Sequence, residues 1–330
     1  MPVETAVDIP VVDFSPFLGG SLEGKQTVAQ AIYRACHEVG FIYLKNHGIP
    51  QTSIAEAFEQ SKQFFALPLA KKQSIAWSGE TSNRGYVGVG RERLDETQPG
   101  DLKEAFNVGR EMSCDEMSCR EMSSGALSSA QQALVVNRWP EGQTEFKAAI
   151  SEFFEICAEA AEQIFRAFAI ALQMPESYIA DKHQTRGYTL RLLHYPPMDA
   201  LPKPGQIRAG AHSDYGTLTL LFQDNVGGLE AQVNQGEWIA APSIPGAILI
   251  NTGDLTQRWS NDVFRSTKHR VGLPAPEKAG RDRYSIAFFC QPDADADIVC
   301  LPSCQSADNP PRYAPIKSGD YLLSRLQATY

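Results

Sequence analysis

Residues 212–216 read His-Ser-Asp-Tyr-Gly, and a second histidine, His269, follows about 55 residues later. Residues two apart on a β-strand lie on the same face, so His212 and Asp214 are expected to reach one point. With His269 they predict a three-ligand, half-open metal site, a pattern that suits iron(II) with an oxygen co-substrate. A zinc hydrolase or a cupin-like isomerase uses the same ligand types, and a lone His-x-Asp is also common on polar strand faces.

Residues 283–285, shortly after His269, read Arg-Tyr-Ser. A guanidinium fork and a hydroxyl two residues apart on one strand face form a receptor for a carboxylate. Arg283 and Ser285 therefore predict a dicarboxylate co-substrate, which neither the zinc hydrolase nor the cupin-like isomerase requires. The competing interpretation of Arg283 is a salt bridge on the surface.

Short β-rich runs separated by Gly, Pro and Asn clusters surround these motifs and predict strands over residues 188–195, 217–223, 246–251 and 283–290. Closing such strands into a double-sheet jelly roll brings ligands from different strands into one mouth. Earlier in the chain, apolar residues at helical spacing predict helices over 26–39, about 52–66 and 144–173, and a buried strand at 41–44. The predicted fold class is α+β, with a jelly-roll core braced by helices.

Further motifs follow in a fixed order along nearly the whole chain. They are Ile9-Pro-Val-Val-Asp-Phe, Gly40-Phe-Ile-Tyr-Leu-Lys-Asn-His-Gly-Ile, Asn83-Arg-Gly-Tyr, Leu190-Arg-Leu-Leu-His-Tyr-Pro, Thr219-Leu-Leu-Phe-Gln-Asp and Arg258-Trp-Ser-Asn-Asp. Three more motifs are His-Ser-Asp-Tyr-Gly (212–216), Ser-Thr-Lys-His-Arg-Val (266–271) and Arg-Tyr-Ser-Ile-Ala-Phe-Phe (283–289). In all of these motifs the chain resembles the 2-oxoglutarate/iron(II) oxygenases of the isopenicillin N synthase-like superfamily. The four motifs from Asn83 to Arg258 look like the fungal thymine-7-hydroxylase-like branch, which also includes polyketide-tailoring oxygenases.

This resemblance implies a dioxygenase that uses Fe(II), 2-oxoglutarate and O2 and releases succinate and CO2. The residues that it implies are His212, Asp214 and His269 for iron, Arg283, Ser285 and Tyr195 for 2-oxoglutarate, and Arg191, Tyr215, Phe289, Asn83 and Tyr86 for the substrate. Two ordinary alternatives concern the pocket: Phe289 is a core residue, and Arg191 pairs with Glu104.

The residues of the expected pocket favour a planar, oxygenated substrate, because Arg191 can donate to a carbonyl or phenolate and Phe289 can stack on a ring. We expect oxidation of a C–H bond, in an alkyl group, of an aromatic or polyketide-derived small molecule. The alternatives are a thymine-type pyrimidine methyl hydroxylase, an oxidative ring-expansion enzyme, and a non-oxygenase zinc hydrolase or metal-binding module. Residues 111–135 depart from the shorter thymine hydroxylase pattern.

The composition limits the partners and the cellular setting. A net charge of -9 and a pI near 5.3 argue against a broad nucleic-acid-binding surface. Seven cysteines, an odd number at irregular spacing, predict reduced thiols and a cytoplasmic protein rather than a disulfide framework. The amino terminus lacks the pattern of a secretion signal, and no apolar run approaches the roughly 20 residues that a membrane span needs.

We expect three regions within one structural unit: an N-terminal mixed region (1–110), a low-complexity surface insertion (111–135) and a helix-braced catalytic jelly roll (136–330). The insertion contains a five-residue repeat, and its Cys114 and Cys119 have no further ligand nearby to make a metal site. The glycines at 85, 88 and 90 miss the dinucleotide-binding spacing and predict a mobile loop near the pocket.

Overall fold

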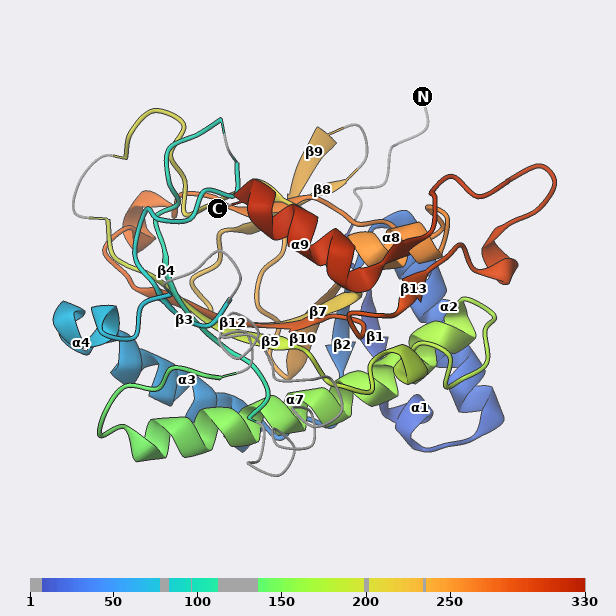
Figure 1. The fold of residues 1–330 in the computed structure, drawn as a ribbon, viewed down its shortest axis with the longest axis horizontal. Coiled ribbons are helices and arrows are strands. Elements are labelled where there is room, and N and C mark those ends of the chain that lie inside the picture. Colours follow the sequence, from blue (N-terminus) through green and yellow to red (C-terminus); the bar gives the residue numbers. More distant parts are fainter. Residues whose placement is uncertain are drawn as a thin grey trace, which may run out of the picture.

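Two β-sheets form the centre of the computed structural model, which describes residues 8–77, 83–95, 97–111, 136–198, 202–233 and 236–329. The larger sheet has eight strands in the order β1-β2-β10-β7-β12-β5-β4-β3, and the smaller has four in the order β6-β11-β8-β9. Apolar side chains from both sheets pack into one shared cluster. The protein therefore has the predicted double-sheet jelly roll with helices around it (Figure 1).

The strands of the larger sheet include elements from both ends of the chain. They are β1 (Val11–Asp13), β2 (Phe41–Lys45), β3 (Gly85–Val87), β4 (Glu104–Val108), β5 (Thr189–Tyr195), β7 (Leu218–Gln223), β10 (Ala247–Thr252) and β12 (Arg283–Cys290). The smaller sheet contains β6 (Ala209–His212), β8 (Leu229–Val233), β9 (Glu237–Ala240) and β11 (His269–Val271). A separate pair joins β13 (Asp297–Ile298) to β14 (Ile316–Lys317).

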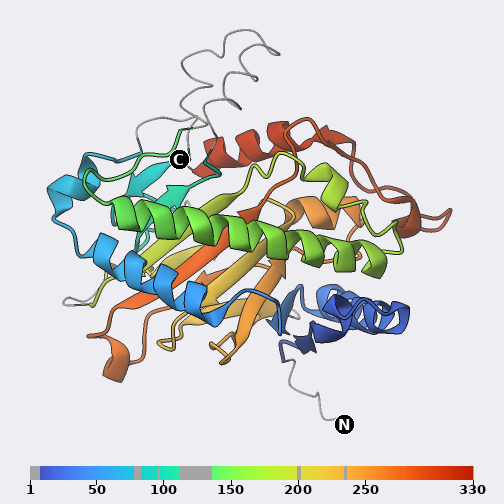
Figure 2. The ribbon, with the colours of Figure 1, turned by 90° about the horizontal axis from the view of Figure 1, so that it is seen from below.

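The longest helices cover the outer face of the larger sheet, and the remaining helices lie elsewhere around the core (Figure 1). They are α1 (Ser15–Leu18), α2 (Leu22–Glu38), α3 (Gln51–Phe65), α4 (Leu69–Gln73), α7 (Thr144–Ala171), α8 (Asp254–Trp259) and α9 (Ser318–Thr329). Figure 2 shows α7 and α3 side by side across this face. The predicted helices at 26–39, 52–66 and 144–173 correspond to α2, α3 and α7, so these predictions are confirmed apart from their ends.

Helix α7 is long because its apolar residues repeat at helical spacing over its whole length. Residues from Phe146 to Phe168 on this face are buried against the sheet and its neighbouring helices. The helix ends at Ala171, shortly before Pro175, whose ring cannot continue it. This packing holds the outer face of the larger sheet and leaves its inner face to the smaller sheet.

Strand alternation decides which side chains face the inside of the jelly roll. On β12, Ile286 and Phe288 pack in the cluster beneath the helices, whereas Arg283, Ser285 and Phe289 line an internal cavity. On β5, Leu190 and Leu192 likewise face the helices, and Arg191, Leu193 and Tyr195 line the cavity. The two strands pair antiparallel with Ser285 opposite Leu193, so their inward residues form one continuous surface.

The glycine prediction is partly wrong, because Gly85 begins strand β3 rather than lying in a loop. Its φ is 105°, and a Cβ on it would lie 2.4 Å from the Ile75 carbonyl oxygen. Only glycine fits this close approach of two backbone segments. Gly88 and Gly90 come after the strand, in the connection that leads toward β4.

Strands from the predicted N-terminal and C-terminal regions pair directly, since β4 is hydrogen-bonded to β5. Residues 112–135, with Cys114, Cys119 and most of the predicted insertion, lie outside the described residues. The five cysteines at 36, 157, 290, 300 and 304 are buried and unbridged in the described part of the chain. Across the same residues, no helix is long and apolar enough to cross a membrane.

Candidate active site

Three side chains from two neighbouring strands and a loop meet at one end of the smaller sheet. His212 is the last residue of β6, His269 is the first residue of β11, and the strands pair with these two residues opposite each other. Asp214 lies in the loop just beyond β6 rather than on the strand itself. One ligand atom from each of the three residues lies within 4.8 Å of the other two.

The two imidazoles present their Nε2 atoms to the same carboxylate oxygen. Asp214 Oδ1 lies 3.9 Å from His212 Nε2 and 3.8 Å from His269 Nε2. The opposite ring nitrogens face backbone carbonyls: His212 Nδ1 is 2.8 Å from the Gly210 oxygen, and His269 Nδ1 is 3.2 Å from the Thr267 oxygen. Such contacts hold the proton on Nδ1 and leave the Nε2 lone pair for a metal.

Two further side chains orient the carboxylate of Asp214. Its Oδ2 accepts hydrogen bonds from Thr219 Oγ1 at 2.5 Å and from Asn251 Nδ2 at 2.7 Å. Both donors are buried, on β7 and β10 of the larger sheet. Because Oδ2 is occupied in this way, Oδ1 is the oxygen that faces the imidazoles.

The protonation of these groups matches what a metal ligand requires. Burial and the neighbouring His269 lower the pKa of His212 to about 3, so its ring is neutral at neutral pH. Burial alone would raise the pKa of Asp214, but the two imidazoles and the hydrogen bonds from Asn251 and Thr219 lower it instead. Neutral imidazole and ionised carboxylate are the forms that bind metals. Two nitrogens and one oxygen on one side also fit the facial donor set of non-haem iron(II).

We expect the Asn251→Ala variant to bind iron(II) about 10-fold more weakly, because Asp214 loses one of the donors that orient it. Anaerobic titration of the metal-free protein with iron(II) measures this affinity. The matched control is Asn225→Ala, which removes an exposed asparagine outside the site. Equal iron affinities for the two variants would contradict the orienting role of Asn251.

Deeper in the same cavity, β12 places the Arg283 guanidinium, which is 1% exposed. Its Nε donates to the Gly227 carbonyl at 2.8 Å, and its terminal nitrogens lie 3.3 Å from Ser285 Oγ and Gln223 Oε1. The ring of Tyr195 lies against the guanidinium, 4.6 Å from Cζ to the ring centroid. Arg283 is therefore not a surface residue, which rules out the surface salt bridge considered from the sequence.

The partners of Arg283 are all neutral. Among the residues that the structure describes, no Asp or Glu oxygen lies within 4.0 Å of its guanidinium. A second buried guanidinium, Arg208, lies close enough that the charge of Arg283 lowers its pKa, after the larger effect of burial. Buried cations without a counter-charge are costly, so this end of the cavity is suited to an anionic ligand.

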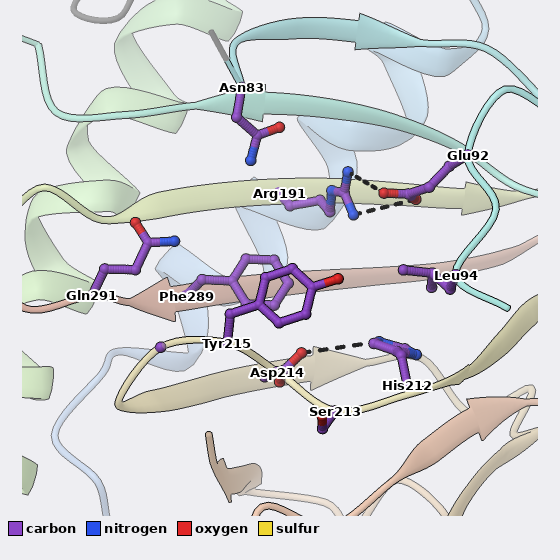
Figure 3. A pocket seen from close by; sticks show the side chains of 11 residues that line it. Asn83, Glu92, Leu94, Arg191, His212, Ser213, Asp214, Tyr215, Phe289 and Gln291 are labelled. Atoms are coloured by element: carbon purple, nitrogen blue, oxygen red, sulfur yellow. Dashed lines mark hydrogen bonds and ion pairs between the residues drawn. The ribbon is translucent and has the colours of Figure 1, made fainter. Parts of the chain in front are cut away.

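The outer part of the cavity is a second pocket, between the metal-ligand candidates and the connection from β3 to β4. Figure 3 shows its polar end, with Asn83, Arg191 and Glu92, and the rings of Phe289 and Tyr215 between that end and Asp214. Leu94 and Gln291 line the sides. Phe289 and Tyr215 are half-buried and face the pocket.

Arg191 pairs with Glu92 and not with Glu104. Its terminal nitrogens lie 3.0 and 3.3 Å from the two Glu92 oxygens, and its Nε donates to Asn107 Oδ1 at 2.8 Å. Asn107 in turn donates to Asn83 Oδ1 at 2.6 Å. The guanidinium is therefore held in a fixed orientation at the polar end of the pocket.

The predicted substrate contact from Tyr86 is corrected by the structure. Tyr86 pairs with Phe106 across β3 and β4, and both side chains lie on the helix-covered face of the sheet. The Tyr86 hydroxyl donates to Glu104 Oε2 at 2.6 Å, and the same oxygen binds Lys72 at 2.8 Å. Glu104 is thus engaged on the opposite face of the sheet from the pocket, which explains why it does not reach Arg191.

Several residues of the site were missed from the sequence. Three charged residues, Glu92, Asp101 and Lys103, come from the irregular connection between β3 and β4. The others are Leu94, Gln291, Thr219, Asn251 and Arg208. Both Thr219 and Asn251 lie in predicted strands: Thr219 is a polar residue between two leucines, and Asn251 is the polar residue that ends an apolar run. The irregular connection carries no periodic pattern from which burial could be read.

The chain matches two known family descriptions. Residues 9–142 match "non-haem dioxygenase in morphine synthesis N-terminal", and residues 187–292 match the "2OG-Fe(II) oxygenase superfamily". The second match contains all three metal-ligand candidates and the Arg-x-Ser pair.

Individual relatives are similar over nearly the whole chain. The 2-oxoglutarate-Fe(II) type oxidoreductase hxnY of Emericella nidulans is 33% identical over 97% of this chain and 90% of its own. Proline hydroxylase buaE of Petromyces alliaceus is 34% identical over 98% of this chain and 100% of its own. The structure of a full-length Neurospora crassa enzyme in complex with alpha-KG and thymine has a TM-score of 0.86 at 36% identity, covering 99% of this chain and 98% of that chain. The resemblance to 2-oxoglutarate/iron(II) oxygenases, and to fungal enzymes of the thymine-7-hydroxylase-like branch, is thus confirmed.

Proposed function

Since the chain belongs to the 2OG-Fe(II) oxygenase superfamily, we propose that it oxidises a C–H bond of a planar small molecule held between Phe289 and the metal centre. The enzyme is a 2-oxoglutarate-dependent dioxygenase, which rules out the zinc hydrolase and the metal-binding module as alternatives. We assign iron(II) to His212, Asp214 and His269. We assign the distal carboxylate of 2-oxoglutarate to Arg283 and Ser285, with Tyr195 beside them.

One observation carries the assignment of the co-substrate: the buried Arg283 guanidinium, whose hydrogen-bond partners among the described residues are all neutral, lines the same cavity as the His, Asp, His set. The guanidinium fits one carboxylate of a dicarboxylate, and the open face of the metal set fits the other end. Arg208 adds a second positive charge near Arg283. The chain thereby supplies both contacts that 2-oxoglutarate needs.

In the mechanism that we propose, the protein acts by positioning. Iron(II), 2-oxoglutarate and O2 supply the oxidising chemistry, with succinate and CO2 as co-products. Arg283 and Ser285 would hold the distal carboxylate of 2-oxoglutarate at the inner end of the cavity. Asn251 and Thr219 orient Asp214 so that its Oδ1 would face the metal. Phe289, Tyr215 and Leu94 exclude water from the outer pocket and give a ring two apolar surfaces.

The polar end of the pocket supports a ring that carries oxygen or nitrogen. Asn83, Arg191 and Gln291 offer donors and acceptors around the two aromatic side chains. A thymine-type pyrimidine and an oxygenated aromatic ring of polyketide origin both suit this arrangement. Because the relatives include one named as a proline hydroxylase and a Neurospora crassa enzyme solved with thymine, cyclic amino acids and pyrimidines also belong in the test.

The experiment that tests the proposed function measures succinate formed from 2-oxoglutarate by the full-length protein with added iron(II). We expect succinate release that depends on both additions and is increased by the true substrate. A screen of pyrimidines and L-proline against alkylated phenolic aldehydes separates the substrate classes. Absence of iron-dependent succinate with every compound would overturn the proposal.

We expect the Arg191→Ala variant to lower the amount of product formed per succinate about 10-fold, because the ring loses its polar anchor while Arg283 stays in place. Phe289→Ala should act in the same direction, since it removes the stacking surface. Product and succinate are measured in the same reaction with the substrate found in the screen. The matched control, Phe58→Ala, changes a half-buried phenylalanine of α3 that packs against the core beneath the helices, away from the pocket. Wild-type coupling in folded Arg191→Ala and Phe289→Ala would show that the pocket lies elsewhere.

A further inference from the structure

Four charged side chains form a buried series of ion pairs that begins at the wall of the outer pocket, where Arg191 and Glu92 lie, and continues away from it. Arg191 pairs with Glu92, Glu92 pairs with Lys103 at 2.9 Å, and Lys103 also contacts Asp101. All four are nine-tenths or more buried, and they come from β5 and from the connection between β3 and β4. Two of these four side chains are formally positive and two are formally negative, so their charges cancel.

The chain of charges is anchored at both ends. At one end, Asp101 Oδ1 accepts from the backbone nitrogen of Gly210, on the strand that carries His212. At the other end, the Nε of Arg191 is held by Asn107. Burial disfavours the Lys103 ammonium, but Glu92 and Asp101 more than offset this and raise its pKa. Glu92 is thus a fixed carboxylate that lines the pocket next to Arg191.

We propose that Glu92 is a specificity-determining residue that restricts the substrate to compounds without an anionic group at the polar end, and in particular to rings carrying a carbonyl beside an N–H or O–H. This inference rests on the proposed function of the pocket and specifies its substrate class. A neutral carbonyl accepts from Arg191 without displacing Glu92, and the adjacent N–H or O–H donates to the Glu92 carboxylate.

An anionic substrate meets two obstacles at this position. Its carboxylate would compete with Glu92 for the guanidinium, and Glu92 would remain beside it because Lys103 holds it from behind. Two carboxylates at one low-dielectric site repel each other strongly. The same reasoning applies to a phenolate, so Arg191 is expected to bind a carbonyl or a neutral phenol.

The test uses two pairs of compounds that differ only in an amide or a carboxylate: 4-methylbenzamide with 4-methylbenzoate, and indole-3-acetamide with indole-3-acetate. Affinities are measured by calorimetry on protein loaded with iron(II) and 2-oxoglutarate without oxygen, which prevents turnover. For the wild type we expect each amide to bind at least about 10-fold more tightly than its carboxylate, the factor that about 1.4 kcal/mol produces.

The variants separate charge from shape. Glu92→Gln should shift the amide-to-carboxylate ratio at least about 10-fold toward the carboxylate, because the Glu92 charge beside Arg191 is removed. Glu92→Asp keeps the charge and should keep the preference for the amide. The matched control, Glu176→Gln, removes a carboxylate from the Lys25 ion pair outside the site and should leave the ratio unchanged. If Glu92→Gln does not fold, the amide-to-carboxylate ratios of the wild type and of Glu92→Asp still test the inference.

Three outcomes would overturn the inference: carboxylates that bind the wild type as tightly as the amides, amides that do not bind at all, or an unchanged ratio in folded Glu92→Gln. Tight binding of the zwitterion L-proline would also overturn it, since the proline ammonium would pair with Glu92 and the proline carboxylate with Arg191, which breaks the Arg191–Glu92 ion pair. Iron-dependent succinate release by the wild type is measured in parallel. If that activity is present, any of these outcomes counts against Glu92 alone, whereas its absence counts against the proposed function.

Discussion

The His269→Ala variant is expected to lose iron(II) binding and to form no measurable succinate. In the proposed site His269 is one of two candidate nitrogen ligands, and its Nε2 lies 3.8 Å from the Asp214 oxygen at the centre of that site. Losing a direct ligand should cost more than the roughly 10–100-fold in metal affinity that loss of an outer hydrogen bond costs. Metal content after loading with iron(II), together with succinate formation, measures both effects.

The matched control for this change is His37→Ala. His37 is an exposed histidine on α2 whose Nδ1 contacts the Val263 carbonyl, away from the cavity. This variant should keep full iron occupancy and turnover. The metal assignment fails if folded His269→Ala retains the iron content and activity of the His37→Ala protein.

The Arg283→Ala variant is expected to weaken the binding of 2-oxoglutarate by about 100-fold while leaving iron occupancy unchanged. The fold-change corresponds to about 3 kcal/mol, the scale of one or two charge-assisted hydrogen bonds in a buried site. Ser285 remains but provides no charge. The apparent KM for 2-oxoglutarate, taken from succinate formation at saturating iron(II), measures this loss of affinity.

Two comparisons make this result specific. Arg283→Lys keeps a positive charge without the fork and should lose less affinity than Arg283→Ala. Arg312→Ala removes an arginine that pairs with Asp262 on the surface, and it should behave as the wild type. An unchanged constant for 2-oxoglutarate in Arg283→Ala would reject Arg283 as the carboxylate receptor and would return attention to Arg208.

Much of the site could be predicted because its pattern is local. Arg283, Ser285 and Phe289 are separated by even numbers of residues on one strand, and a strand places such residues on one face wherever it lies in the fold. The same holds for Arg191 and Tyr195 on β5. The helices could also be predicted from the sequence, because an apolar face at helical spacing depends only on the residues of the helix itself.

The error at Tyr86 has a different origin. Its motif begins at Asn83, which lines the pocket, but β3 starts only at Gly85, and pairing with β4 turns Tyr86 toward the helices. The face that a short strand presents depends on its register with a neighbour, because a shift of one residue exchanges the two faces. That register is a property of the assembled sheet and has no signal within the motif.

The amino-acid sequence by itself indicated the class of the protein, through motifs that resemble a known family, and it indicated the metal-ligand candidates and the candidate carboxylate receptor. The shared face of Arg283 and Ser285 follows from strand geometry alone, whereas the place of Asp214 in the loop after β6 does not. The tertiary structure alone decided that Arg191 faces Glu92 rather than Glu104, and that Lys103 and Asp101 are buried behind them. Glu92, Asp101 and Lys103 come from the irregular connection between β3 and β4, where burial and pairing follow from how distant strands pack. The charge that the pocket accepts is therefore set by contacts between segments far apart in the chain, which no single stretch of sequence encodes.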